Sequence, residues 1–109
     1  MTAHSPSGKL VALSEWIDAS NANRDSEAVT WGRLSKITEE AGEVIGAFIG
    51  CTGQNPRKGV THTRDDVRKE LLDVALTALA AFEHMTGHRG LSITSLFDHI
   101  DAVHERAGL

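Results

Sequence analysis

Apolar side chains recur every three or four positions through most of this sequence, and this spacing constrains the fold more than any other feature. Residues at that spacing share one face of an α-helix, whereas a half-buried β-strand alternates apolar and polar residues at every second position. Alternating segments of this kind are absent from the sequence. The periodicity therefore predicts an all-α protein.

Turn-forming residues divide the periodic sequence into four predicted helices. We expect these helices at about residues 9–19, 26–49, 64–85 and 92–106. Thr63 and Asp66 resemble a capping box at the start of the third helix, and Gly87 suits its end. Ser92 is a suitable N-cap for the fourth helix. Residues 1–8 are small and polar, so we expect them to be disordered.

Length and composition restrict the class of protein. A chain of 109 residues without low-complexity segments predicts one domain, residues 1–109. Its formal charge of −4 argues against nucleic-acid binding and against an anionic membrane surface, since both need a basic patch. Apolar segments fall short of the roughly 18 residues of a membrane span. The single cysteine, Cys51, allows no internal disulfide, so we expect a reducing, cytoplasmic location.

Two pairs of carboxylates stand three residues apart in otherwise apolar segments: Glu40 with Glu43, and Glu70 with Asp73. Residues at this spacing are neighbours on one helix face, where like charges repel unless they share a cation. We expect these side chains to be partly buried, where an unpaired charge is costly. Four carboxylates from two facing helices would form an oxygen-rich site suited to Mg²⁺ or Mn²⁺.

A single pair of acidic residues on a helix is usually only part of a solvated face. Two such pairs, on two helices joined by one loop, favour metal binding instead. A non-catalytic helical module that binds a metal or a protein partner through the same acidic face is the alternative hypothesis. The small number of cations in the fourth predicted helix keeps this alternative open.

The residues Glu39-Glu40-x-x-Glu43 and Glu70-x-x-Asp73 together resemble the EExxE…ExxD signature of the MazG-like, all-α nucleoside triphosphate pyrophosphohydrolases. The resemblance covers about residues 31–82 and implies a MazG-like bundle with its core at about residues 26–86. It also implies Mg²⁺-dependent hydrolysis between the α- and β-phosphates of a nucleotide, often as house-cleaning of the nucleotide pool. The resemblance implies four metal ligands: Glu40, Glu43, Glu70 and Asp73. It implies that Glu39 and Glu40 are catalytic, with Glu39 as a supporting or water-orienting acid.

An anionic substrate also needs fixed cations. Lys36 stands one turn before the first acidic motif, and Arg57 and Lys58 lie in the loop between the two motifs, where they could close over phosphates. Trp31, with Trp16 as the other choice, could stack on a nucleobase, although a helical tryptophan is more often part of a core. Asn55 could contact a base or ribose, although asparagine is also ordinary in turns. These residues are the candidate substrate contacts.

Apolar residues nearly encircle the third predicted helix, which is typical of a central or interfacial helix. We therefore expect oligomerisation, as a homodimer or homotetramer, to complete the bundle. The histidines predict no second site. His84 and His88 are four residues apart, but Gly87 stands between them at the expected helix end, so we do not expect them to share a face.

Overall fold

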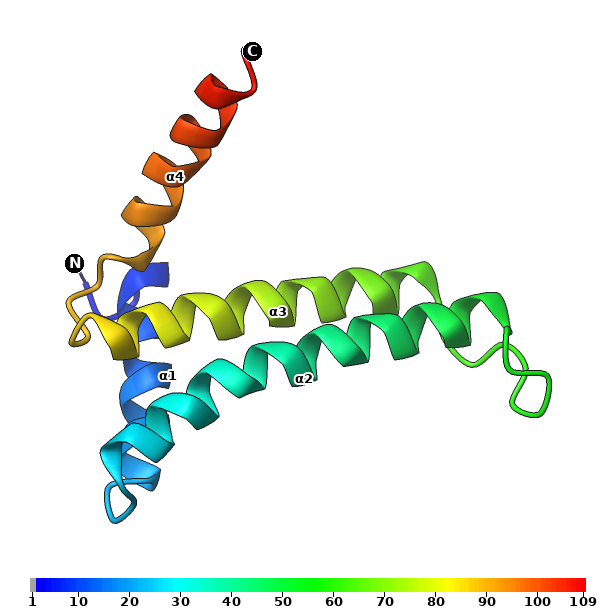
Figure 1. Cartoon of the computed structure of the whole chain (residues 1–109), viewed down its shortest axis with the longest axis horizontal. Coiled ribbons are helices and arrows are strands. Elements are labelled where there is room, and N and C mark those ends of the chain that lie inside the picture. Colours follow the sequence, from blue (N-terminus) through cyan, green and yellow to red (C-terminus); the bar gives the residue numbers. More distant parts are fainter. Residues whose placement is uncertain (1) are drawn as a thin grey trace. The chain divides into compact units, whose positions relative to one another are not determined.

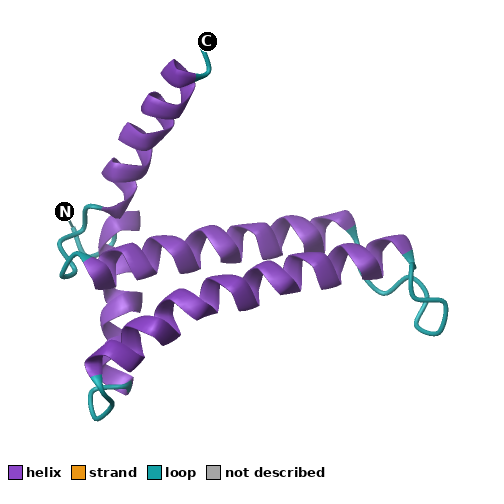
Figure 2. Ribbon diagram, viewed as in Figure 1, coloured by secondary structure: helices purple, strands orange, loops and turns teal. Residues whose placement is uncertain are grey.

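The computed structural model describes residues 2–109, and every regular element among them is an α-helix (Figure 1, Figure 2). The four helices are α1 (Pro6–Ser20), α2 (Ser26–Thr52), α3 (Arg64–Met85) and α4 (Ser92–Arg106). The predictions of an all-α protein and of four helices are confirmed. The chain forms two compact units. The first contains residues up to Ser26 together with Leu79–Leu109, and the second is Glu27–Ala78.

Helix α1 begins earlier than the sequence suggested. Ser5 is its N-cap, and the Ser5 hydroxyl accepts a hydrogen bond of 3.0 Å from the backbone N–H of Gly8. Pro6 occupies the first helical turn, where its missing N–H costs nothing and its fixed φ suits the helix. Gly8 is buried. The expectation of disorder over residues 1–8 is therefore wrong from Pro6 onward, because local capping outweighs the polar composition.

The second unit is a hairpin in which α2 and α3 run side by side (Figure 1). The backbone carbonyl of Gly50 accepts hydrogen bonds from the N–H groups of Thr61 (2.9 Å) and His62 (3.3 Å), which tie the loop back to the end of α2. Thr63 and Asp66 form the predicted capping box. The Thr63 N–H donates to the Asp66 carboxylate at 2.8 Å, and the Asp66 N–H donates to the Thr63 hydroxyl at 3.2 Å. The pairing confirms this predicted start of the third helix.

The first unit has a small core between α1 and the last turns of α3. Its apolar members are Leu10, Val11, Ala80 and Ala81. Ser92 is not the N-cap of α4 as predicted, since the helix begins at Ser92 and Leu91 takes the cap position without a side-chain hydrogen bond. The carboxylate that performs the capping comes from α3, as described below. The prediction failed because a residue distant in sequence supplies the acceptor.

Large apolar side chains remain exposed on both units. On α3 these include Leu71, 54% exposed, and Leu72, 64% exposed. Exposed apolar residues in such density are typical of surfaces that bind other molecules. Among the described residues, no helix is both long enough and apolar enough to span a membrane.

Candidate metal centre

Three glutamates meet where α2 and α3 lie side by side. Glu40 and Glu43 come from α2 and Glu70 from α3, and one carboxylate oxygen of each lies within 4.8 Å of the other two. Glu40 and Glu43 share a face because they are three residues apart on one helix. Glu70 joins them through the register of the hairpin. Within residues 2–109, this is the one group of three or more acidic, histidine or cysteine side chains close enough to share an ion.

The electrostatic state of Glu40 reflects this crowding. Its side chain is only 14% exposed. Desolvation raises the pKa of the Glu40 carboxyl, the negative charge of Glu43 raises it further, and Asp73 adds to the effect, while Lys36 opposes it. A carboxyl whose pKa rises for these reasons binds either a proton or a cation more readily than an ordinary surface glutamate.

Glu70 supplies the second indication that the cluster can hold a cation. Its Oε2 atom is buried and has no hydrogen-bond partner in the structure. A buried acceptor without a partner is costly, and one beside two other carboxylates is costlier still. An ion held by the three glutamates would satisfy this oxygen. The all-oxygen donor set fits Mg²⁺ or Mn²⁺, which are hard cations that prefer carboxylates.

Asp73, the fourth predicted ligand, is exposed and lies outside the group of three. It stands one turn beyond Glu70 on α3, which displaces it along the helix axis. Asp73 is nevertheless near enough to raise the pKa of Glu40. The structure thus brings together three of the four predicted ligands and places the fourth within electrostatic range.

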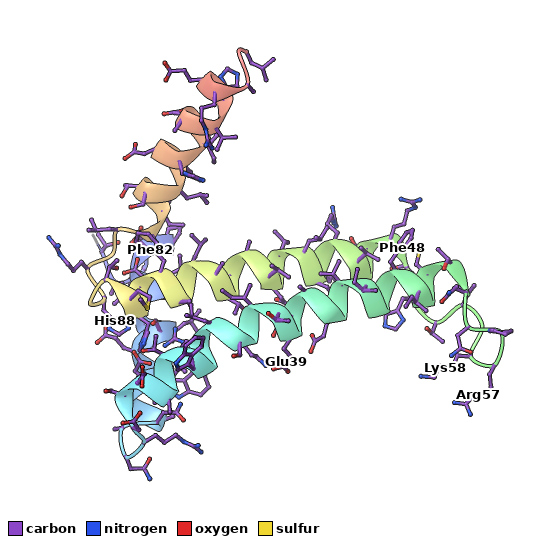
Figure 3. All side chains as sticks on the ribbon, viewed as in Figure 1. Glu39, Phe48, Arg57, Lys58, Phe82 and His88 are labelled. Atoms are coloured by element: carbon purple, nitrogen blue, oxygen red, sulfur yellow. The ribbon has the colours of Figure 1, made fainter. Side chains whose placement is uncertain are left out.

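Glu39, a predicted catalytic residue, lies on the side of α2 away from α3 (Figure 3). Its side chain is 58% exposed and forms an ion pair with Lys36, whose Nζ is 3.0 Å from Glu39 Oε1. The same Nζ lies 3.7 Å from Glu40 Oε1. The hydrogen bond to Glu39 raises the pKa of Lys36, and the negative charges of Glu39 and Glu40 add to it. Lys36 is therefore the predicted cation that the structure places beside the carboxylates.

The other predicted substrate contacts in the loop lie elsewhere. Arg57 and Lys58 are exposed at the loop, beyond the ends of the two helices and away from Glu39 (Figure 3). Asn55 organises this turn. Its Oδ1 accepts a hydrogen bond of 3.1 Å from the N–H of Arg57, and its carbonyl accepts one of 2.9 Å from Gly59. The structure therefore gives Asn55 the turn-forming role that the sequence had left open.

The two tryptophans are both on the surface. Trp31 on α2 is 66% exposed, and Trp16 on α1 is 68% exposed. The general expectation that a helical tryptophan packs in a core is wrong for this chain. Both rings are therefore accessible to a ligand or a partner.

The first unit contains a polar network that the sequence analysis did not predict. His84 Nδ1 lies 2.7 Å and His88 Nε2 lies 3.4 Å from the same oxygen, Oδ2 of Asp18 on α1. Ser14 Oγ is 2.8 Å from His88 Nε2. His88 adopts a left-handed backbone conformation with φ of 59°, which turns its ring back toward α1. His84 and His88 do not share a helix face, because α3 ends at Met85, as expected. Both nevertheless meet at Asp18, an arrangement that helical spacing could not reveal.

Comparison of this chain with protein-family models, with curated proteins and with solved structures gives no match. The structure by itself defines the class: an all-α protein with a three-glutamate cluster between two helices.

Proposed function

We propose that the chain is a Mg²⁺-dependent nucleotide pyrophosphohydrolase that converts a ribo- or deoxynucleoside triphosphate to the monophosphate and pyrophosphate. One observation carries the proposal: Glu40, Glu43 and Glu70 converge, and the buried Oε2 of Glu70 has no partner. The resemblance of the two acidic motifs to the MazG-like signature supplies the choice of reaction. A house-cleaning role on the nucleotide pool follows from the same resemblance, and the single cysteine, Cys51, supports a cytoplasmic location.

In this proposal Glu40, Glu43 and Glu70 hold Mg²⁺, and Asp73 adds negative charge beside it. The bound ion would neutralise phosphate oxygens and lower the pKa of a water molecule at the site. Without an ion, the carboxylates would repel a polyanionic substrate. Glu40 and Glu39 are the candidate groups to orient the attacking water and accept its proton. A new bond forms between the water oxygen and phosphorus, and the bond to the oxygen bridging the α- and β-phosphates breaks.

Lys36 is the best-placed residue to contact the phosphates. It already lies beside Glu39 and Glu40, so it is at the edge of the cluster. Trp31, on the same helix and exposed, is the candidate to stack on the base. Arg57 and Lys58 would reach the substrate only by movement of the loop, as expected of flexible segments that close over ligands.

We also propose a homodimer or homotetramer that covers the exposed apolar residues of the hairpin. Leu71 and Leu72 on α3, with Ile45 on α2, are all more than half exposed. A hairpin of two helices has no interior of its own, and bundles of four helices are the usual solution.

The test is a panel of ribo- and deoxynucleoside triphosphates incubated with Mg²⁺ and separated by chromatography. We expect the monophosphate and pyrophosphate without accumulation of the diphosphate. Glu40→Gln should reduce turnover by about two to three orders of magnitude or more. Glu27→Gln, which removes an exposed acid from the first turn of α2, is the matched control and should stay active. Diphosphate with inorganic phosphate would contradict the proposed reaction.

A non-catalytic metal- or partner-binding module is the second candidate. The observation that favours it is the position of Arg57 and Lys58, which are away from the cluster and so leave Lys36 as its adjacent cation. Metal binding without turnover of any nucleotide in the panel would support this module over the enzyme.

A further inference from the structure

Helix α4 carries an apolar stripe that its own unit leaves largely uncovered. Ile93, Leu96, Ile100 and Val103 are spaced by three, four and three residues, which is the a/d spacing of a helix that pairs with another helix. Leu96 is 38% exposed, Ile100 is 52% exposed and Val103 is 42% exposed. Phe97, 60% exposed, widens the stripe on one side. We call these five residues the α4 seam.

The beginning of α4 is anchored to α3. Ser92, the first helical residue, is buried, and its N–H donates to the buried Glu83 carboxylate at 2.8 Å. From that point α4 leads away from α1 and from the end of α3, which belong to the same unit (Figure 1). An isolated helix of about 15 residues is only marginally stable in water, and packing of its apolar face normally stabilises it. The regular helix through Arg106 therefore indicates a partner for the seam.

We propose that the α4 seam pairs with the α4 seam of a second copy of this chain, in antiparallel orientation. A twofold axis near Asp98 would set Ile100 against the partner's Leu96, and Ile93 against the partner's Val103. In this register Ile93 and Ile100 are a positions, and Leu96 and Val103 are d positions. Each pair across the interface then joins one a residue to one d residue, so that side chains of similar size meet. The surface is self-complementary, which a twofold interface requires because both subunits present the same residues.

The distribution of charge agrees with a second copy as the occupant. The chain as a whole is acidic, with a formal charge of −4, so most encounters between two copies involve repulsion. On α4, however, the acids occupy the helix face opposite or well away from the seam: Asp98, Asp101 and Glu105. The residues that flank the seam carry no negative charge: His99, His104 and Arg106. Two seams can therefore meet without bringing carboxylates together.

The apolar area that the seam can bury sets the expected affinity of the dimer. Five partly exposed apolar side chains can bury on the order of 400 Å² per subunit, about half of the roughly 800 Å² per partner of a standard interface. The total lies in the range of weak or transient protein–protein contacts. We expect a dissociation constant of about 10–100 µM for a dimer held by this seam alone.

Sedimentation velocity measured from about 5 to 500 µM protein brackets that constant. Ile100→Asp places a charge in the seam and should weaken association by about tenfold or more, since a buried unpaired charge is costly. Ala102→Asp, on the exposed opposite side of α4, adds the same charge and should change association by less than about twofold. Circular dichroism of each variant, with Ile100→Ala as a milder substitution, separates loss of association from loss of helix. Equal association of both aspartate variants would overturn the proposal, as would a monomer at every concentration.

Cysteine pairing tests the orientation independently of any contact through the hairpin. In a Cys51→Ala background, oxidation of a mixture of Leu96→Cys and Ile100→Cys chains should give the mixed disulfide dimer. Ile100→Cys alone should give little, because the antiparallel arrangement places the two residues about one helical turn apart. Efficient pairing of Ile100→Cys with itself would contradict the antiparallel arrangement. Absence of any cross-linked dimer would overturn the pairing itself. Neither result depends on the metal site.

Discussion

Glu83 Oε2 lies 2.8 Å from the backbone nitrogen of Ser92, so a buried acid of α3 caps the first turn of α4. Its other oxygen accepts a hydrogen bond of 2.9 Å from the N–H of Gly90. Burial by itself would raise the pKa of Glu83, but the hydrogen bonds from Ser92 and Gly90 outweigh it, and the pKa is lowered from 4.5. The link between α3 and α4 is thus held by a carboxylate that must stay ionised.

Glu83→Gln should therefore destabilise the protein by about 2 kcal/mol near neutral pH, because an amide replaces a charged acceptor with one acceptor and one donor. The pH dependence has a definite sign. Since the folded-state pKa lies below that of the unfolded chain, the stabilisation is present above about pH 4.5 and is lost as pH falls through the folded value. Urea unfolding from neutral to acidic pH should show that the difference in free energy of unfolding between the wild type and Glu83→Gln decreases in that window. A constant difference between the two proteins at all pH values would contradict this role.

The three-glutamate cluster predicts an unequal effect of two acidic residues on metal affinity. Glu43→Ala removes a member of the cluster and should weaken Mn²⁺ binding by about a hundredfold, whereas Asp73→Ala should weaken it by about three- to tenfold, through charge alone. Without metal, both variants should be as stable as the wild type or more so, since repulsion on Glu40 is relieved. Isothermal titration calorimetry measures the affinities. Equal losses would show that Asp73 is also a ligand.

Lys36 lies beside the cluster, with its Nζ 3.7 Å from Glu40 Oε1. Lys36→Met should strengthen Mn²⁺ binding by about two- to fivefold, because a competing cation beside Glu40 is removed, while leaving the free energy of unfolding within about 0.5 kcal/mol. Nucleotide affinity, measured with a non-hydrolysable triphosphate, should fall. Lys69→Met is the matched control, because Lys69 pairs with Asp65 instead. Equal Mn²⁺ and nucleotide affinities of the two variants would show that Lys36 does not contribute to the site.

Two glycines of α2 should respond oppositely to alanine. At Gly50 a Cβ would collide with the side chains of His62 and Thr61, so Gly50→Ala should destabilise the hairpin by about 1–3 kcal/mol. At Gly46 no atom outside the local helix lies within 4 Å of the added Cβ, and Gly46→Ala should stabilise the helix by about 0.5–1 kcal/mol. Chemical unfolding of both variants gives the comparison. Stabilisation at Gly50 would show that the loop is not tied to α2 as described.

Ser14 contacts both the backbone of α3 and the ring of His88. The Ser14 hydroxyl is buried and donates to the carbonyl of Ala80 at 3.0 Å, so its oxygen must accept the contact of 2.8 Å from an N–H at His88 Nε2. Nitrogen NMR of the imidazole should find a proton on Nε2. Ser14→Ala should cost about 1–3 kcal/mol by leaving polar groups unpaired, whereas Ser20→Ala, at an exposed site, should cost less than about 0.5 kcal/mol.

Features of this protein that depend on neighbouring residues could be predicted from the sequence. Helical periodicity predicted four helices, and the Thr63–Asp66 capping box marked the start of α3, because both arise from contacts within one or two turns. The pairing of Glu40 with Glu43 on one face follows equally from their spacing. The Ser5 cap of α1 is equally local, because its hydroxyl accepts from the N–H of Gly8 three residues later.

Contacts between side chains on different helices could not be predicted in this way, because they depend on how the helices pack. The register of α2 against α3 brings Glu70 to Glu40 and leaves Asp73 outside, and sequence spacing on separate helices carries no information on that register. The same holds for Glu83 at the start of α4 and for Asp18 beside His84. Helical periodicity fixes the direction of a side chain around its own axis. Its depth and its partners depend on packing between elements, which is a property of the folded chain.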